Sequence, residues 1–294
     1  MKPFRHALEA KSLSVVTALL RAIPRSASLS IGESLGWLVY KLNIRTEVTR
    51  DNLRHAFPDL DEKGIERITK RCYRHFGTLL AEFARLPVLT SESLDHLVDV
   101  EGWDVLDQVV AGGKGGIVVS GHIGNWELMG AAAAVKGYPV AYVVTTQRNK
   151  QVELMMDRMR ESTGVQIIKR RDAIKGVLKA LKENTLVAIL SDQDTHEAGV
   201  FVEYFGRLAS TPKGAAMFSH RTGAPIIFAE SYRQGKGPLK VVNKLLDLSN
   251  LPADADAAIE EITRRFTKHL EEAVRRHPEQ WFWMHRRWKT SPPS

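Results

Sequence analysis

The chain has 294 residues, of which 44% are hydrophobic and 26% charged, and it contains one cysteine, Cys72. This composition is that of a globular protein, so a disordered or low-complexity chain is excluded. One cysteine also excludes a disulfide framework and a zinc site with two thiolates. The 42 basic residues exceed the 34 acidic ones and give a formal charge of +8, which favours an anionic partner: nucleic acid, an acidic protein or a membrane with phosphate headgroups.

Two short apolar segments lie near the N-terminus, at residues 13–20 and 31–42, with Arg21, Pro24 and Arg25 between them. Neither reaches the roughly 20 apolar residues that a membrane-spanning helix needs. Segments of this length form either core helices or helices that lie in a membrane surface, and the residues themselves leave both uses open.

Residues 1–110 are predicted to be mostly helical. Apolar residues recur three and four positions apart within residues 49–57, 61–86 and 91–100, which is the period of an amphipathic helix. Pro58 separates the first two of these helices.

From residue 116 onward, β-branched runs alternate with longer helical stretches. The predicted strands are residues 116–120, 140–144, 165–168, 185–190, 225–230 and 239–242, with an extended piece at 199–205. The predicted helices are residues 126–136, 150–162, 172–182 and 254–276, with another that opens at Pro212. Such alternation predicts an α/β fold with a mainly parallel sheet covered by helices. We expect a helical N-terminal region, 1–110, and an α/β core, 111–294, in one continuous domain.

The candidate catalytic residues follow the first strand of this core, where sheets of this kind bind ligands. His122 and Glu127 are five positions apart, so on a single helix they would face apart. They can meet only if the chain turns between them, which Gly124 permits, and Asn125 can then cap the next helix. A carboxylate that reaches back to the imidazole would fix its tautomer and leave the other nitrogen free to accept a proton. The alternative is a loop histidine beside an ordinary first-turn acid.

These residues resemble a known family. His122 and Glu127 match the His-x4-Asp/Glu motif of the glycerolipid and lysophospholipid acyltransferases, and the surrounding string resembles the glutamate-bearing branch, the lipid A late (secondary) acyltransferases. The Asp-Gln-Asp turn at 192–194, the segment 201–214 and the Trp-rich segment 278–289 are similar to further signatures of that branch, in the same order.

The resemblance implies a glycerolipid-acyltransferase-like fold and a reaction. A fatty acyl chain would move from a thioester, on acyl carrier protein or coenzyme A, to a hydroxyl of a phosphorylated lipid A precursor. His122 would be the general base and Glu127 its partner, with no cofactor, no metal and no nucleic acid involved. Residues 13–42 would then attach the enzyme, as a peripheral or monotopic protein, to the cytoplasmic face of the inner membrane.

Three further residues are candidates for substrate binding: Asn125, Arg160 and Asp192. Arg160 matches an arginine of the family pattern and could bind the acceptor's phosphate or assist the oxyanion, although a solvated helix charge would look the same. Asp192 follows the fourth strand and could bind substrate or brace its loop. Residues 169–171, Lys-Arg-Arg, could meet a phosphate or form a solvated face.

The segment 281–289 alternates tryptophans with basic residues. We expect Trp281 and Trp283 to pack in the core, and Arg286, Arg287 and Lys289 to be available to membrane or substrate phosphates.

Other functions remain open from the residues. The same chemistry could act on another glycolipid or an aminolipid. A metal-dependent hydrolase could use His122, Asp192, Asp194 and His196, although no second histidine pair completes such a site. A basic binding module without catalysis is a third alternative.

Overall fold

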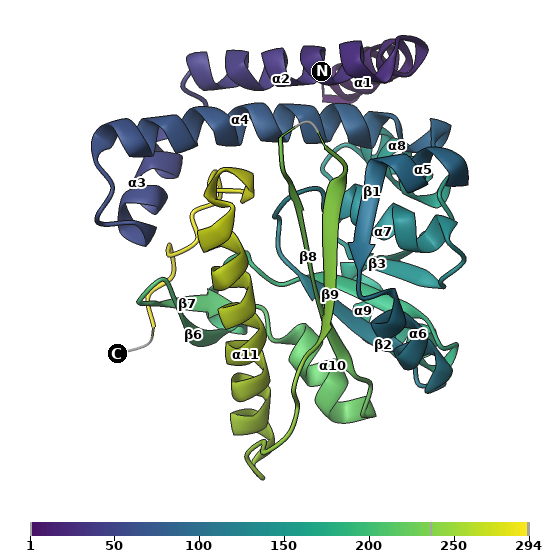
Figure 1. The fold of residues 1–294 in the computed structure, drawn as a ribbon, viewed down its shortest axis with the longest axis vertical. Helices are drawn as coiled ribbons and strands as arrows, with labels where there is room; N and C mark the ends of the chain where they lie inside the picture. The colour runs from purple at the N-terminus through teal and green to yellow at the C-terminus, as the bar shows by residue number, and fades with distance from the viewer. Residues whose placement is uncertain (1, 236, 293–294) are drawn as a thin grey trace.

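The computed structural model describes residues 2–235 and 237–292, and helices and strands alternate from β1 at residue 98 to β5 at residue 190 (Figure 1). The helices are α1 (Lys2–Ala22), α2 (Arg25–Lys41), α3 (Thr46–Ala56), α4 (Glu62–Ala84), α5 (Ser91–Leu97), α6 (Trp103–Ala111), α7 (Trp126–Val135), α8 (Lys150–Glu161), α9 (Ala173–Lys182), α10 (Gly214–Thr222) and α11 (Ala255–Arg276), with short 3-10 turns η1 (Leu86–Val88), η2 (Arg170–Asp172), η3 (His196–Ala198) and η4 (Pro278–Gln280). The strands are β1 (Val98–Glu101), β2 (Gly116–Ser120), β3 (Val140–Val144), β4 (Gln166–Lys169), β5 (Leu186–Leu190), β6 (Val200–Tyr204), β7 (Arg207–Thr211), β8 (Ile226–Arg233) and β9 (Leu239–Leu245).

Seven of these strands form one sheet, in the order β1-β9-β8-β2-β5-β3-β4. Neighbouring strands run parallel at every pairing except β8 with β9. Strands β6 and β7 form a separate antiparallel hairpin. The predicted α/β fold with a mainly parallel sheet is therefore confirmed.

Helices cover both faces of the sheet, and the side chains of each strand alternate between these two faces. Ile117, Val119 and Val187 face one side and pack in the main core with α9, α10 and α11. Val118 and Leu186 face the other side, toward α6 and α7. Both faces are buried, which is why the central strands are almost continuously apolar.

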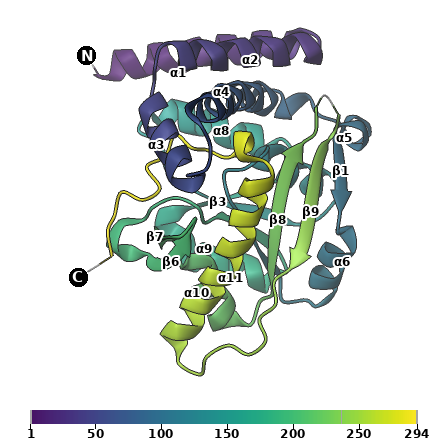
Figure 2. The ribbon, with the colours of Figure 1, turned by 60° about the vertical axis from the view of Figure 1, so that its left-hand side comes forward.

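The N-terminal helices form a layer of their own. Helices α1 and α2 lie on the side of α4 that is turned away from the sheet (Figures 1 and 2). Helix α2 crosses α4 closely at Gly36 and Gly77: a Cβ atom at Gly36 would lie 2.1 Å from the carbonyl oxygen of Tyr73. No helix within residues 2–235 and 237–292 combines the length and the apolar character needed to cross a membrane.

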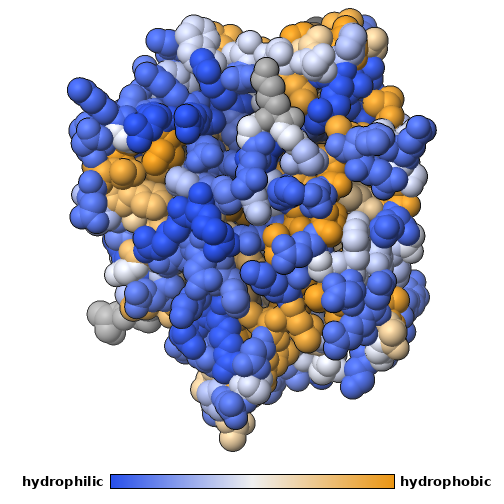
Figure 3. All heavy atoms as spheres, viewed as in Figure 1, coloured by the Kyte–Doolittle hydropathy of each residue, from blue (hydrophilic) through white to orange (hydrophobic). Residues whose placement is uncertain are grey.

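The outer side of this layer exposes many large apolar side chains among polar ones. Its large exposed side chains include Leu8, Leu19, Leu35, Leu38 and Leu42, each between 46% and 63% exposed. Along the upper edge of Figure 3, where α1 and α2 lie, hydrophobic residues reach the surface.

Three local features differ from the predictions. The helix expected over 91–100 ends at Leu97, because Val98–Glu101 pairs in parallel with β9 and becomes the edge strand β1. The segment before Pro212 is β7, which the sequence did not predict. It is held by antiparallel pairing with β6, and this pairing is tertiary information that a five-residue segment does not carry by itself. The helix expected to begin at Pro212 begins two residues later, at Gly214.

Candidate active site

The loop between β2 and α7 carries His122 and is fixed by backbone hydrogen bonds to the C-terminal segment. The backbone N–H of Phe282 donates to the carbonyl oxygen of His122 (3.0 Å), and the N–H of Gly124 donates to that of Gln280 (2.9 Å). Gly124 has φ +61°, and a Cβ atom there would lie 1.8 Å from the carbonyl oxygen of Ser231. Only glycine therefore fits this turn.

Asp192, directly beyond the end of β5, is the partner of His122. Its Oδ1 lies 2.7 Å from Nδ1 of the imidazole, and its Oδ2 accepts from the backbone N–H of His122 at 2.7 Å. The indole N–H of Trp281 also donates to Oδ2, at 2.8 Å. A carboxylate only accepts, so Nδ1 carries the proton and Nε2 of the neutral ring is the basic nitrogen. No described residue forms a hydrogen bond with Nε2.

The surroundings of Asp192 keep it ionised. Its side chain is 1% exposed. Burial by itself raises the pKa of the carboxyl, but the positive charge that His122 carries when it is protonated, together with the hydrogen bonds from His122 and Trp281, outweighs burial and lowers the pKa to about 2. A buried anion held in contact with Nδ1–H stabilises the imidazolium that forms when Nε2 takes a proton.

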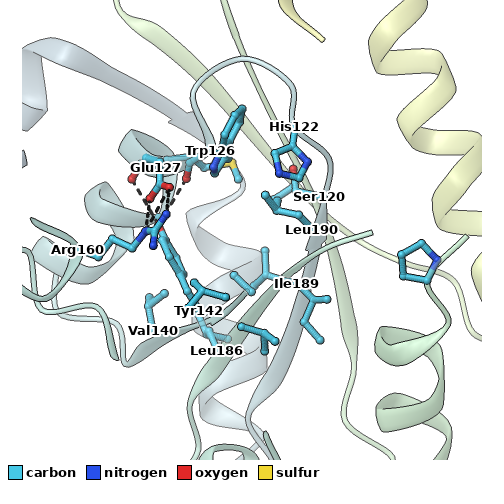
Figure 4. Close-up of a pocket in the computed structure, with 18 of the residues that line it drawn as sticks. Ser120, His122, Trp126, Glu127, Val140, Tyr142, Arg160, Leu186, Ile189 and Leu190 are labelled. Atoms are coloured by element: carbon cyan, nitrogen blue, oxygen red, sulfur yellow. Dashed lines mark hydrogen bonds and ion pairs between the residues drawn. The ribbon is translucent and has the colours of Figure 1, made fainter. Parts of the chain in front are cut away.

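Glu127 does not occupy the position that the sequence predicts. Its carboxylate accepts from Nε and Nη2 of Arg160, at 3.0 and 2.6 Å. The expected pairing with His122 is therefore wrong: Glu127 is bound to Arg160, and Asp192 takes its place. In the view of Figure 4, Trp126 lies between His122 and Glu127. The guanidinium is itself largely buried, and a carboxylate that binds its planar fork in two places is a strong counter-ion.

Asn125 caps α7, as predicted: its side-chain oxygen accepts from the N–H of Leu128 at 3.0 Å. Its side-chain amide donates to Oε2 of Glu82 at 2.7 Å, and Arg25 and Arg233 also bind this 6%-exposed carboxylate. Asn125 is 1% exposed and is not among the residues that line the cavity described below. Its side chain thus links the loop to α2, α4 and β8.

A cavity of about 880 Å³ opens beside His122 and Arg160, near the upper end of the roughly 300–1,000 Å³ of small-molecule sites. Its walls are mostly apolar and include Val140, Tyr142 and Leu186 on the α7 side of the sheet (Figure 4). The imidazole ring is partly exposed to this cavity, 4.8 Å from the ring centroid of Trp126.

The other residues singled out from the sequence are either buried in the core or accessible at the surface and in the cavity. Trp281 and Trp283 are at most 1% exposed, so their predicted core packing is confirmed. Arg287 is also 1% exposed and binds the carbonyl oxygen of Ser210, so its predicted contact with phosphates is wrong. Lys169 is held by two carboxylates of α8, whereas Arg170 lines the cavity.

No group of three or more His, Cys, Asp or Glu side chains within the described parts of the chain is arranged to hold a metal ion. Asp194 accepts from Thr290 and from the backbone N–H of His196. The thiol of Cys72 is fully buried, which raises its pKa to about 12 and keeps it protonated.

Sequence reasoning missed two residues of this site. Trp281 was expected only to pack, yet its indole N–H helps to hold Asp192. Glu82 was not singled out because it lies in an ordinary amphipathic helix pattern. Its only sequence signal is its place among the apolar residues Leu79, Leu80 and Phe83, where an acidic residue needs buried partners.

The site thus consists of a histidine held by a buried carboxylate, at the end of a central parallel strand and beside a mostly apolar cavity. Comparison with known proteins gives the class: this protein is an acyltransferase. Residues 4–290 match the model of the bacterial lipid A biosynthesis acyltransferase family, and the chain belongs to that family.

Curated relatives agree with this assignment. The lipid A biosynthesis palmitoleoyltransferase of Escherichia coli K12 is 26% identical over 253 residues, covering 85% of this chain and 81% of its own length. The lipid A biosynthesis lauroyltransferase of the same strain is 25% identical over 280 residues, covering 93% and 89%. The phosphatidylinositol mannoside acyltransferase of Mycobacterium tuberculosis H37Rv is 24% identical over 219 residues, covering 72% and 67%.

Proposed function

We propose that this protein transfers a fatty acyl chain from an acyl carrier protein thioester to a hydroxyl of a phosphorylated lipid A precursor, with His122 as general base. The observation that carries the proposal is the geometry of one side chain. The Nδ1 of His122 is bound to the buried Asp192 carboxylate, so the basic Nε2 is left to the substrates.

The proposed step involves no covalent intermediate on the protein. The acceptor hydroxyl gives its proton to Nε2 of His122 as its oxygen attacks the thioester carbonyl. The C–S bond then breaks with its electron pair going to sulfur, and the imidazolium returns the proton to the thiolate. The products are an ester and a free thiol, and Asp192 stabilises the imidazolium between the two proton transfers.

The pair formed by Glu127 and Arg160 lines the cavity next to His122. Because Arg160 already binds Glu127, and its Nη1 lies 4.0 Å from Asp157, its charge is largely neutralised. We therefore propose that Glu127 and Arg160 act as a positioning pair, which holds α7 against α8 so that the loop before α7 keeps its shape. In a double-mutant cycle, Glu127→Gln and Arg160→Gln should reduce transfer by amounts that do not add; additive losses would contradict a shared role.

The family supports a lipid A-type acceptor, and the Mycobacterium relative leaves another phosphorylated glycolipid as the second candidate. Mass spectrometry of lipids from a strain with and without the gene distinguishes them. Loss of one acyl chain from lipid A supports the first candidate. Unchanged lipid A together with a change in another glycolipid supports the second.

We propose that the enzyme lies on the cytoplasmic face of the inner membrane through the apolar outer side of α1 and α2. Three exposed leucines, Leu35 and Leu38 of α2 and Leu42 directly after it, can enter the headgroup region. Replacing these three with serine should release the protein from vesicles of anionic phospholipid in a sedimentation assay. Unchanged sedimentation would contradict this mode of attachment.

The catalytic proposal is tested with a His122→Ala variant, a carrier-protein thioester and a lipid A precursor. We expect transfer to fall by about 10²- to 10⁴-fold, which is the usual contribution of general acid–base catalysis. His220→Ala, at an exposed histidine at the end of α10, is the matched control and should keep its activity. Wild-type transfer by His122→Ala would overturn the mechanism.

A further inference from the structure

The cavity beside His122 extends onto both faces of the sheet. Adjacent strand residues point to opposite sides, and the cavity is lined by Ala188 together with Ile189, and by Tyr142 together with Val143. It therefore passes around the carboxyl ends of β3 and β5. We call the part on the α7 side the chain arm and the part on the α9 side the α9 arm.

The chain arm is deep and apolar. It is lined along β5 from Leu190 back to Leu186, four residues or about 13 Å of strand. Trp103 and Leu106 of α6 and Ala133 of α7 also line it. These walls suit the hydrocarbon chain of the acyl donor.

The α9 arm is more polar and opens where α9 begins. Arg170 and Ala173 line it on one side, and Lys213 lines it from the turn before α10. Neither Arg170 nor Lys213 has a carboxylate within salt-bridge distance among the described residues. Two cationic side chains without a neutralising partner at the mouth of a cavity favour an anionic ligand.

The surface next to this opening is strongly basic. Residues 170–183, which form η2, α9 and the residue after it, hold five basic and two acidic side chains. All five basic side chains are exposed: Arg170, Arg171, Lys175, Lys179 and Lys182. Among them lies Ile174, whose side chain is 61% exposed. A basic surface with an apolar side chain within it is complementary to an acidic protein that presents an apolar residue of its own.

We propose that the acyl carrier protein docks on this η2–α9 surface, that its prosthetic arm reaches His122 through the α9 arm, and that the acyl chain enters the chain arm. This inference rests on the proposed function, because that function supplies the donor. The carrier is an acidic protein that bears its thioester on a flexible arm, so docking next to the opening would deliver the thioester to the histidine.

The position of α9 favours a protein partner over a membrane. Helix α4 lies between α9 and the N-terminal helices in both views of the fold (Figures 1 and 2). A bilayer that contacts the apolar outer side of α1 and α2 is therefore separated from α9 by α4. The acceptor lipid and the protein donor would then reach His122 from different directions.

The test compares two donors with the double variant Lys175→Glu/Lys179→Glu. One donor is the acyl carrier protein thioester, and the other is the same acyl chain on coenzyme A, which has the prosthetic arm without the acidic protein. Charge reversal at an interface rim acts mainly on association. We expect kcat/KM for the carrier thioester to fall roughly tenfold or more through KM, with a weaker dependence on salt. We expect kcat/KM for the coenzyme A thioester to change less than about twofold.

Lys244→Glu/Lys268→Glu is the matched control, since both lysines are exposed and neither lines the cavity. It makes the same change in net charge and should leave both donors unaffected. The proposal is overturned if Lys175→Glu/Lys179→Glu uses the carrier thioester as well as wild type, or loses both donors equally. The proposal is also overturned if Lys175→Glu/Lys179→Glu binds anionic vesicles less well but keeps wild-type activity with the carrier thioester. If wild-type protein transfers from neither donor, the proposed function itself fails.

Discussion

Replacement of Asp192 by asparagine removes the negative charge beside His122 but leaves the size of the side chain almost unchanged. Three donors meet the carboxylate: the ring N–H and the backbone N–H of His122, and the indole N–H of Trp281. An asparagine can accept at one oxygen only, so at least one of these donors must face an NH₂ group. The variant therefore loses the counter-charge of the imidazolium and at least one of the hydrogen bonds that hold this arrangement in place.

The size of the effect follows from the pKa of Asp192. A pKa of about 2, against the ordinary 3.8, means that the surroundings favour the carboxylate over the acid, by roughly 2–3 kcal/mol at about 1.4 kcal/mol for each pKa unit. If the same interaction stabilises the imidazolium in the transition state, its loss lowers kcat by about 10²-fold. Disruption of the tautomer extends the expected loss toward about 10⁴-fold.

The assay is single-turnover acyl transfer with saturating donor and acceptor, so that the chemical step is observed. Asp194→Asn is the matched control. It changes the second acidic residue of the same turn, and the Asp194 side chain forms no hydrogen bond with His122. Circular dichroism and thermal unfolding show that both variants are folded. Asp192→Asn with wild-type kcat, or with a loss no larger than that of Asp194→Asn, would refute the assignment of Asp192 as the partner of the base.

Three further predictions concern the buried network, the cavity and acid stability. Glu82→Ala leaves Arg233 and its other partners without their buried acceptor, and urea unfolding should show a loss of about 3–5 kcal/mol; a loss below about 1 kcal/mol would contradict the network's structural role. Ala188→Leu fills the chain arm midway along β5, so the preferred acyl donor should become shorter in a chain-length series, and an unchanged profile would place the chain elsewhere. The neutral ring of His285 accepts from the N–H of Asp194 at 3.0 Å, and burial lowers its pKa to about 4. The unfolded chain therefore binds a proton first as the pH falls below 6.5, and stability should decline between pH 6.5 and 4, by roughly 1–2 kcal/mol because solvent screens this partly exposed ring. His285→Gln, which can still accept, should show a smaller decline over that range; an identical decline would assign it to other groups.

The sequence determined the architecture because strand and helix signals are local. β-branched runs at positions such as 116–120 and 140–144 mark buried parallel strands, and the structure has strands there. The N-cap at Asn125 follows from the residues around it, since a cap is a contact across three positions. The family resemblance rested on motifs that are likewise contiguous, and the match over residues 4–290 confirms it.

The partner of His122 was decided only by the tertiary structure. Glu127 is five positions away and Asp192 is seventy, yet β2 and β5 are neighbours in the sheet and their carboxyl ends bring Asp192 to the imidazole. Arg160, brought in by α8, holds Glu127 away. Proximity along the chain therefore suggested the wrong acid.

The composition makes the chain basic but does not locate the positive charge. In the structure, some basic side chains are buried and others are exposed. Arg287 is enclosed in the core, whereas residues 170–182 keep their basic side chains at the surface beside the cavity. The sequence by itself determines how much positive charge the protein has. Burial, which depends on contacts between residues distant in the chain, determines which part of that charge can meet an anionic partner.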